Sequence, residues 1–132
     1  MSSLTDYLER ALLDHVLGGA PYTPPATIHA GLLTTPPTDD TPGLEVEAAD
    51  YARQPVVFGA TASAPDGRTI KSNNATVTFE STTLWGTIFA VGFYDAATGG
   101  NLLAYDDRVT PFTIDEFDSK PFPAGTMTWR LT

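Results

Sequence analysis

Trp85-Gly-Thr-Ile-Phe-Ala-Val-Gly-Phe-Tyr-Asp-Ala-Ala-Thr-Gly-Gly-Asn-Leu-Leu-Ala-Tyr105 is the stretch that decides the fold. Residues 87–94 and 101–105 are apolar segments rich in residues that favour strands, and a turn containing two adjacent glycines separates them. This order is typical of a buried β-hairpin, because glycine takes the positive φ angles that a tight reversal needs. Gly92 interrupts the first segment, which predicts a bulge or a close approach by another backbone.

Five further segments predict strands on either side of this hairpin: residues 27–33, 51–58, 74–80, 109–114 and 126–131. Pro55 indicates an edge position or a bulge, because proline cannot donate to a strand ladder. Residues 74–80 alternate apolar and polar side chains, the pattern of a sheet with one solvated face. The sequence therefore predicts a mainly β fold, an antiparallel β-sandwich or compact barrel of about seven strands with one N-terminal α-helix.

Residues 3–17 form the one convincing helical segment, in which Ser3 and Asp6 predict a capping box and Gly18 and Gly19 end the helix. The apolar stripe of this helix either covers an open end of the sheet or binds a neighbouring subunit, and the first interpretation is favoured. Pro21, Pro24 and Pro25 then hold the chain extended. Residues at helical spacing along the stripe are Leu4, Leu8, Ala11, Leu12 and Val16, widened by Leu13 and Leu17.

These patterns divide the chain into an N-terminal helix with a Pro-rich arm over residues 1–25 and a single β domain over residues 26–132. The helix and the arm are the parts that we expect to contact a partner. The candidate interface residues are Leu4, Leu8, Leu12, Leu13, Val16, Leu17, Tyr22, Pro24 and Pro25.

Composition restricts the function. The 16 acidic and 7 basic residues give a formal net charge of −9, which opposes binding to nucleic acid or to an anionic membrane. A chain of 132 residues without cysteine fits one domain with a single core and excludes disulfides and thiolate metal sites. Neither a signal peptide nor a membrane-spanning run is visible, so we expect synthesis in the cytoplasm.

The sequence carries no standard catalytic, metal or cofactor motif, so we expect a protein that is not an enzyme and has no cofactor. His15 and His29 are far apart in the sequence and nothing places them together. Three acidic clusters, Asp39-Asp40, Asp106-Asp107 and residues 115–118, offer oxygens to a cation such as Ca²⁺, although solvated loops are the favoured interpretation. Aromatic residues that either line a binding face or pack in the core are Tyr22, Tyr51, Trp85, Tyr94, Tyr105 and Trp129.

Several stretches taken together resemble one family. They are residues 4–19, Tyr22-Thr-Pro-Pro-Ala-Thr27, Gly31-Leu-Leu-Thr34 with Pro37-Thr-Asp39, Tyr51-Ala-Arg-Gln54, Trp85-Gly-Thr87 and Asp95-Ala-Ala-Thr-Gly-Gly-Asn-Leu-Leu103. With them the chain resembles a family of short virion proteins of tailed bacteriophages, variously labelled head decoration, minor structural or tail fibre proteins. Residues 113–123 depart from the glycine-containing turn of this pattern.

The resemblance implies a non-enzymatic structural protein of the phage particle, made in the host cytoplasm. The first hypothesis is a capsid decoration protein on the outer shell, with the major capsid protein as partner and self-association into a homotrimer. In this hypothesis the N-terminal helix and residues 22–41 lie over seams between capsid subunits. The alternative is a tail-associated or receptor-binding module of the tail fibre type, present in few copies.

Overall fold

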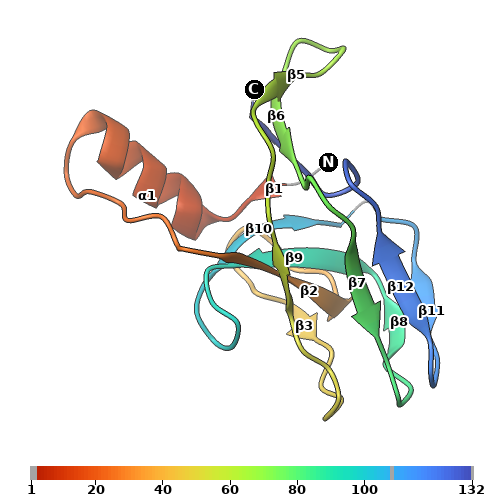
Figure 1. Ribbon diagram of the computed structural model, residues 1–132. Helices are drawn as coiled ribbons and strands as arrows, with labels where there is room; N and C mark the ends of the chain where they lie inside the picture. The colour runs from red at the N-terminus through yellow and green to blue at the C-terminus, as the bar shows by residue number, and fades with distance from the viewer. Residues whose placement is uncertain (1–2, 108, 132) are drawn as a thin grey trace.

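This computed structural model describes residues 3–107 and 109–131 of the chain. Within these residues, every pair of strands is antiparallel (Figure 1). The strands form four sheets and one helix stands beside them, so the predicted mainly β class with a single N-terminal helix is confirmed. The elements are β1 (Ser3–Leu4), α1 (Asp6–Leu17), β2 (Ile28–Thr35), β3 (Leu44–Glu45), β4 (Gln54–Val56), β5 (Ala62–Ser63), β6 (Thr69–Ser72), β7 (Val77–Glu80), β8 (Gly86–Ile88), β9 (Ala90–Tyr94), β10 (Leu102–Asp106), β11 (Phe112–Ile114), β12 (Ser119–Phe122) and β13 (Thr128–Leu131).

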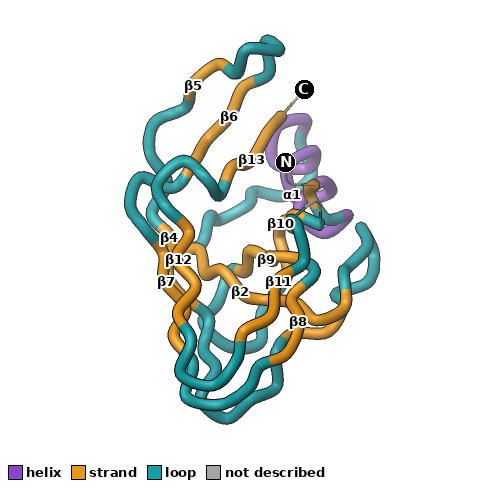
Figure 2. The backbone as a smooth tube through the Cα atoms, turned by 90° about the vertical axis from the view of Figure 1, so that its right-hand side faces the viewer, coloured by secondary structure: helices purple, strands orange, loops and turns teal. Residues whose placement is uncertain are grey.

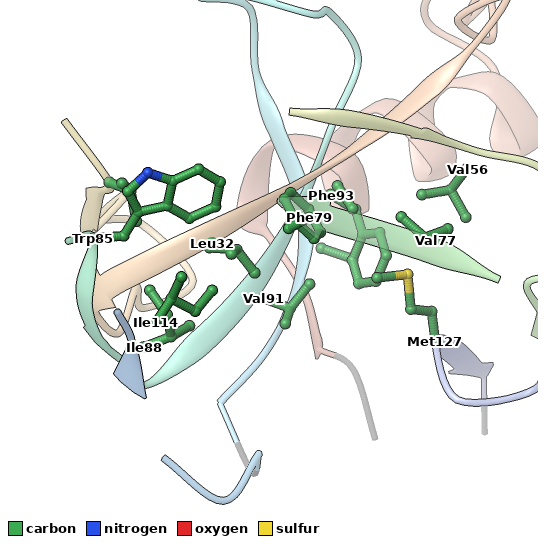
Figure 3. Close-up of a cluster of buried hydrophobic side chains, with 13 residues drawn as sticks. Leu32, Val56, Val77, Phe79, Trp85, Ile88, Val91, Phe93, Ile114 and Met127 are labelled. Carbon is green, nitrogen blue, oxygen red and sulfur yellow. The ribbon is translucent and has the colours of Figure 1, made fainter. Parts of the chain in front are cut away.

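The largest sheet has the order β1-β10-β9-β2-β3, with β4 also paired to β2. The smaller sheets are β8 with β11, β7 with β12, and β5 and β13 on either side of β6. Strands of the large sheet supply Leu32, Val91 and Phe93 to the main apolar cluster, and Phe79 and Ile88 enter it from the smaller sheets (Figure 3). The protein is thus held together by side chains buried between sheets, as in a sandwich.

The hairpin predicted from the opening stretch is present as β9 and β10, and all five residues of β9 are buried. The bulge lies in β10, where the register shifts between Leu102 and Ala104. Gly92 pairs directly with Gly31 of β2. A Cβ atom on Gly92 would meet Leu102 Cδ1 at 2.9 Å, so the absence of a side chain there lets its neighbours pack closely.

The predicted helix begins later than expected. Ser3 and Leu4 pair with β10 as β1, and Thr5 is the N-cap, so the capping box of Ser3 with Asp6 is wrong. The Thr5 side chain accepts from the Leu8 backbone N–H at 3.5 Å. A strand pairing satisfies the backbone at Ser3 and Leu4, which local spacing of apolar residues cannot reveal. The helix ends at Gly18, whose φ is +94°, in agreement with the prediction.

All seven predicted strand segments contain a strand, but residues 87–94 are divided between β8 and β9. The chain also forms β1, β3, β5, β6 and β12, so the strands are shorter and more numerous than expected. Pro55 lies in β4, which pairs with β2. In β7, Val77 and Phe79 are buried while Glu80 is exposed, as the alternating pattern predicts.

Two regions lie on opposite sides of the molecule. In Figure 1 the helix α1 projects to the left, and the loops that join β7 to β8 and β11 to β12 lie at the lower right. The hairpin of β5 and β6 forms a third projection, next to β13 (Figure 2). This arrangement leaves α1 and the two loops free to contact different partners.

Candidate functional site

The first half of α1 is fixed to the large sheet. The Thr5 hydroxyl lies 2.7 Å from the Leu102 carbonyl oxygen and 3.0 Å from that of Leu103, and the Thr5 N–H donates to Leu103 at 2.9 Å. Leu8 is 5% exposed and is the one helix residue that is fully buried. The N-terminal turn of the helix is therefore part of the folded domain.

Between α1, the Pro-rich arm and the sheet lies an apolar groove of about 340 Å³. The arm is held against the helix by the Tyr22 N–H, which donates to His15 Nδ1 at 3.0 Å. The structure brings five of the nine predicted interface residues to the groove, and Ile28, Leu103 and Trp129 complete its apolar lining. The five are Leu8, Leu12, Tyr22, Pro24 and Pro25.

The second half of α1 carries apolar side chains that its own chain leaves uncovered. Leu13 is 59% exposed, Val16 73% and Leu17 78%. Leu4 differs from the other predicted interface residues, because it lies in β1 and packs against the core cluster. Leu8 is the helix residue that is buried against the sheet, and Leu12 is half-buried at the groove. We call the groove together with Leu13, Val16 and Leu17 the α1 surface.

Asp50 joins the loop between β3 and β4 to the loop between β7 and β8. Its Oδ2 accepts from the backbone N–H groups of Thr82 at 2.7 Å and Thr83 at 3.2 Å. Its Oδ1 accepts from the Thr83 hydroxyl at 2.6 Å and from the indole N–H of Trp85 at 3.0 Å. The bond from the Thr83 hydroxyl, followed by that from the Thr82 N–H, holds the pKa of this carboxyl well below its usual range.

Ser81 joins the same loop to the loop between β11 and β12. Its hydroxyl donates to the Asp115 carbonyl at 2.6 Å and accepts from the Asp118 N–H at 3.0 Å. The Ser81 N–H donates to the Asp118 carbonyl at 2.9 Å, and the Trp85 N–H donates to the Ile114 carbonyl at 3.0 Å. These bonds at both ends hold the two loops side by side.

Phe117 lies in the loop between β11 and β12 and is 79% exposed. Its φ is +52°, and within the described residues no other residue except glycine has a positive φ. Leu84, in the neighbouring loop, is 59% exposed. We call residues 48–50, 80–85 and 115–118 the loop end. Every charged side chain of the loop end is acidic, and these are Asp50, Glu80, Asp115, Glu116 and Asp118.

A third polar cluster surrounds Arg53, whose side chain is 8% exposed. Its Nε and terminal nitrogen bind the two oxygens of Glu45 at 2.9 Å each, and its other nitrogen donates to the carbonyls of Ala96 and Gly99. The guanidinium carbon lies 3.5 Å from the centre of the Tyr94 ring. This cluster connects the turn between β9 and β10 to the loop before β4, so its hydrogen bonds stabilise the fold.

Tyr51 contacts the same cluster through Glu45. Its hydroxyl donates to Glu45 at 2.6 Å and accepts from the Leu32 N–H at 2.9 Å, between the parts of β2 that pair with β4 and β3. Burial and the bond to Glu45 raise the pKa of Tyr51 well above its usual value. Burial, with the charge of Glu45, raises the pKa of Tyr94 to about 12. The Tyr51-Ala-Arg-Gln54 stretch is therefore a packing motif.

The first acidic cluster, Asp39-Asp40, has partners within the chain. Asp39 accepts from the Tyr105 hydroxyl at 2.5 Å, and Asp40 accepts from the hydroxyls of Thr38 and Thr41. Among residues 3–107 and 109–131, no group of three or more His, Asp or Glu side chains is placed to hold a metal ion. Over the same residues, no helix is long and apolar enough to cross a lipid bilayer.

Sequence reasoning missed Asp50 and Ser81, and it considered Phe117 only as part of an acidic segment. The contacts of Asp50 and Ser81 span 32 to 37 residues of sequence, so no local pattern reveals them. One local feature of the sequence points to this loop. Residues 113–123 lack the glycine expected at a turn, and the positive φ falls on Phe117 instead.

Comparison with known families identifies the type of protein. A family model described as Podophage GP4 fiber I protein gp80 matches residues 3–130. No curated protein matches the sequence. The family match extends over both the α1 surface and the loop end, and it confirms the resemblance to virion proteins of tailed phages. The chain belongs to the podophage GP4 fiber I protein gp80 family, and it is a virion protein of the short-tailed phage type.

Proposed function

We propose that this chain is a non-enzymatic component of a phage tail fibre, attached to the particle through its α1 surface. The observation that carries the proposal is the match of residues 3–130 to a family whose description names a fibre protein. A role in the fibre corresponds to the alternative hypothesis from the sequence. The polar clusters around Asp50 and Arg53 support a structural role, because their hydrogen bonds go to the chain itself.

The α1 surface is the best candidate for attachment. An isolated helix of about 12 residues is marginally stable in water, and tertiary packing normally supplies its stability. In α1 that packing comes from the first half, whereas Leu13, Val16 and Leu17 remain exposed. A groove of about 340 Å³ lies beside the same helix. The groove borders the helix face of Leu8 and Leu12. Helical geometry places Leu13 and Leu17 on the opposite face, so the helix offers apolar side chains on two sides. Exposed apolar side chains of this kind are typical of a protein interaction site.

Capsid decoration remains the competing prediction, with the major capsid protein as partner and a homotrimer as the assembly. The family description favours the fibre over the outer capsid surface. The two roles differ in copy number, because decoration needs about one chain for each shell subunit, whereas fibres are few. The same measurement therefore tests both.

The test is the number of copies of this chain in purified virions, measured by quantitative mass spectrometry against the major capsid protein. We expect a few chains to a few tens of chains per particle, recovered with tails after heads and tails are separated. A ratio near one per shell subunit, recovered with heads, would show that the fibre proposal is wrong and that decoration is right.

A variant of the α1 surface tests the attachment. Leu13→Ser, Val16→Ser and Leu17→Ser combined should leave the fold intact, since these side chains are exposed, and should abolish incorporation into virions. Val57→Ser is the matched control, because Val57 is 64% exposed and lies outside the α1 surface. Normal incorporation of the triple variant would contradict the proposed attachment.

A further inference from the structure

The loop end presents two exposed apolar side chains on a rigid frame. Phe117 and Leu84 belong to loops that hydrogen bonds of Ser81 hold side by side. Asp50 fixes the second of these loops again, through both carboxylate oxygens. A loop backbone held in this way loses little conformational freedom on binding, which favours affinity.

Phe117 keeps a backbone conformation that is unfavourable for a bulky residue. A φ of +52° is rare outside glycine, asparagine and aspartate, and it costs free energy that the folded chain must supply. Phe117 gains little by burial within its own chain, because it is 79% exposed. The Phe117 side chain therefore adds little to packing inside the monomer, and an exposed aromatic ring is typical of the anchors of protein interfaces.

The charge around the anchor indicates the chemistry of the partner. The loop end contains five acidic residues and no basic residue. Lys120, the first basic residue after Phe117, places its ammonium 4.4 Å from the centre of the Phe112 ring. A surface of one charge attracts partners of the opposite charge and repels phosphorylated or uronate-containing polysaccharides.

We propose that the loop end is a recognition surface for a protein on the host cell, one that presents basic side chains around an apolar pocket into which Phe117 inserts. This inference rests on the proposed function, because attachment through the α1 surface directs the opposite side of the molecule away from the particle (Figure 1). It adds the surface, the anchoring residue and the class of partner.

The test uses phage particles in which the chain carries Phe117→Gly. Glycine takes a positive φ without steric conflict, so this variant should fold at least as well as the native chain. We expect adsorption to host cells to fall about tenfold or more, as for the loss of a central aromatic anchor. Val57→Ser particles are the matched control for the loss of an exposed apolar side chain elsewhere, and they should adsorb normally.

Charge is tested separately. Glu116→Lys should slow adsorption, and adsorption of native particles should weaken as sodium chloride is added, because screening removes the attraction between opposite charges. Treatment of the host cells with protease should abolish the part of adsorption that depends on Phe117. If that part survives protease and is lost after periodate oxidation of surface polysaccharides, the partner is a glycan and the proposal is wrong.

The number of chains per particle distinguishes the two proposals. If Phe117→Gly particles contain the normal number of chains in their tails and adsorb normally, the recognition surface is refuted while the fibre role stands. If the Phe117→Gly chain fails to enter particles, the loop end contacts the virion and the recognition surface is also refuted. If the native chain is found with heads at one copy per shell subunit, the fibre role itself fails.

Discussion

Arg53 shows how much of the fold depends on single residues outside the two exposed surfaces. Its guanidinium binds both oxygens of Glu45 and two backbone carbonyls of the turn between β9 and β10. Such a fork of donors matches a carboxylate in a way that the single ammonium of lysine cannot reproduce. The loss of Arg53 would leave Glu45, which is 24% exposed, without its charged partner.

We predict that Arg53→Ala lowers the free energy of unfolding by about 3 kcal/mol, because it leaves a largely buried carboxylate uncompensated. Equilibrium denaturation in urea measures this change. Arg10→Ala is the matched control, since Arg10 pairs with Asp6 on the surface with the side chain 77% exposed. The control should change the stability by less than about 0.5 kcal/mol. Equal effects of the two variants would refute the structural role of the Arg53 cluster.

At the scale of the element, α1 combines a folded half and an exposed half. Leu8 is 5% exposed and Leu13 is 59% exposed, although both are leucines of one helix. We predict that Leu8→Ala lowers the free energy of unfolding by about 2–4 kcal/mol, through the lost contacts and the cavity left behind.

Leu13→Ala is the control within the same helix, and it should change the stability by less than about 0.5 kcal/mol. Thermal and urea unfolding of the two variants, compared with the native chain, measure the difference. A large loss of stability in Leu13→Ala would mean that the second half of α1 packs in the isolated chain.

Elements with a regular pattern were predictable from the sequence. The alternation in β7 and the apolar run of β9 are local signals, and the structure confirms both. Strands of two residues such as β3 and β5 carry too few side chains for a period to be recognised. Their pairing depends on neighbours in space, and β1 was hidden in the same way because its partner, β10, lies a hundred residues later.

The two candidate surfaces also differ in how far the sequence could predict them. The groove was largely predictable, because the helix and the arm follow each other in the sequence and supply most of its lining. Leu103 and Trp129 come from distant strands, and sequence reasoning did not assign them to it. The loop end could not be predicted, since its frame consists of contacts between loops that are distant in the sequence.

At the scale of the whole molecule, buried tyrosines set the response to alkali. Burial raises the pKa of Tyr51, Tyr94 and Tyr105, and for Tyr94 the pKa reaches about 12. Below a pH of about 10 these groups are neutral in both the folded and the unfolded states. Above it the unfolded chain releases their protons first, so the folded state loses stability as the pH rises toward the folded pKa values.

We therefore predict that these tyrosines leave the melting temperature nearly unchanged between about pH 7 and pH 9. Above about pH 10 their ionisation in the unfolded chain should lower it steadily. Phenolate absorbance during a pH titration provides the second measurement. Tyr51, Tyr94 and Tyr105 should ionise later than free tyrosine, and they should ionise together with unfolding. Ionisation of all five near pH 10 in the folded protein would refute the burial of these rings.

The frame of the loop end has a consequence for how this protein changes over generations. Asp50 and Ser81 hold the loops mainly through backbone groups and threonine hydroxyls, whereas the side chains of Leu84 and Phe117 form no part of that frame because they are apolar. We therefore expect substitutions at the exposed positions to leave folding intact. If the loop end recognises the host, a phage population under selection for new hosts should accumulate its first viable mutations at these positions, while Asp50 and Ser81 stay unchanged.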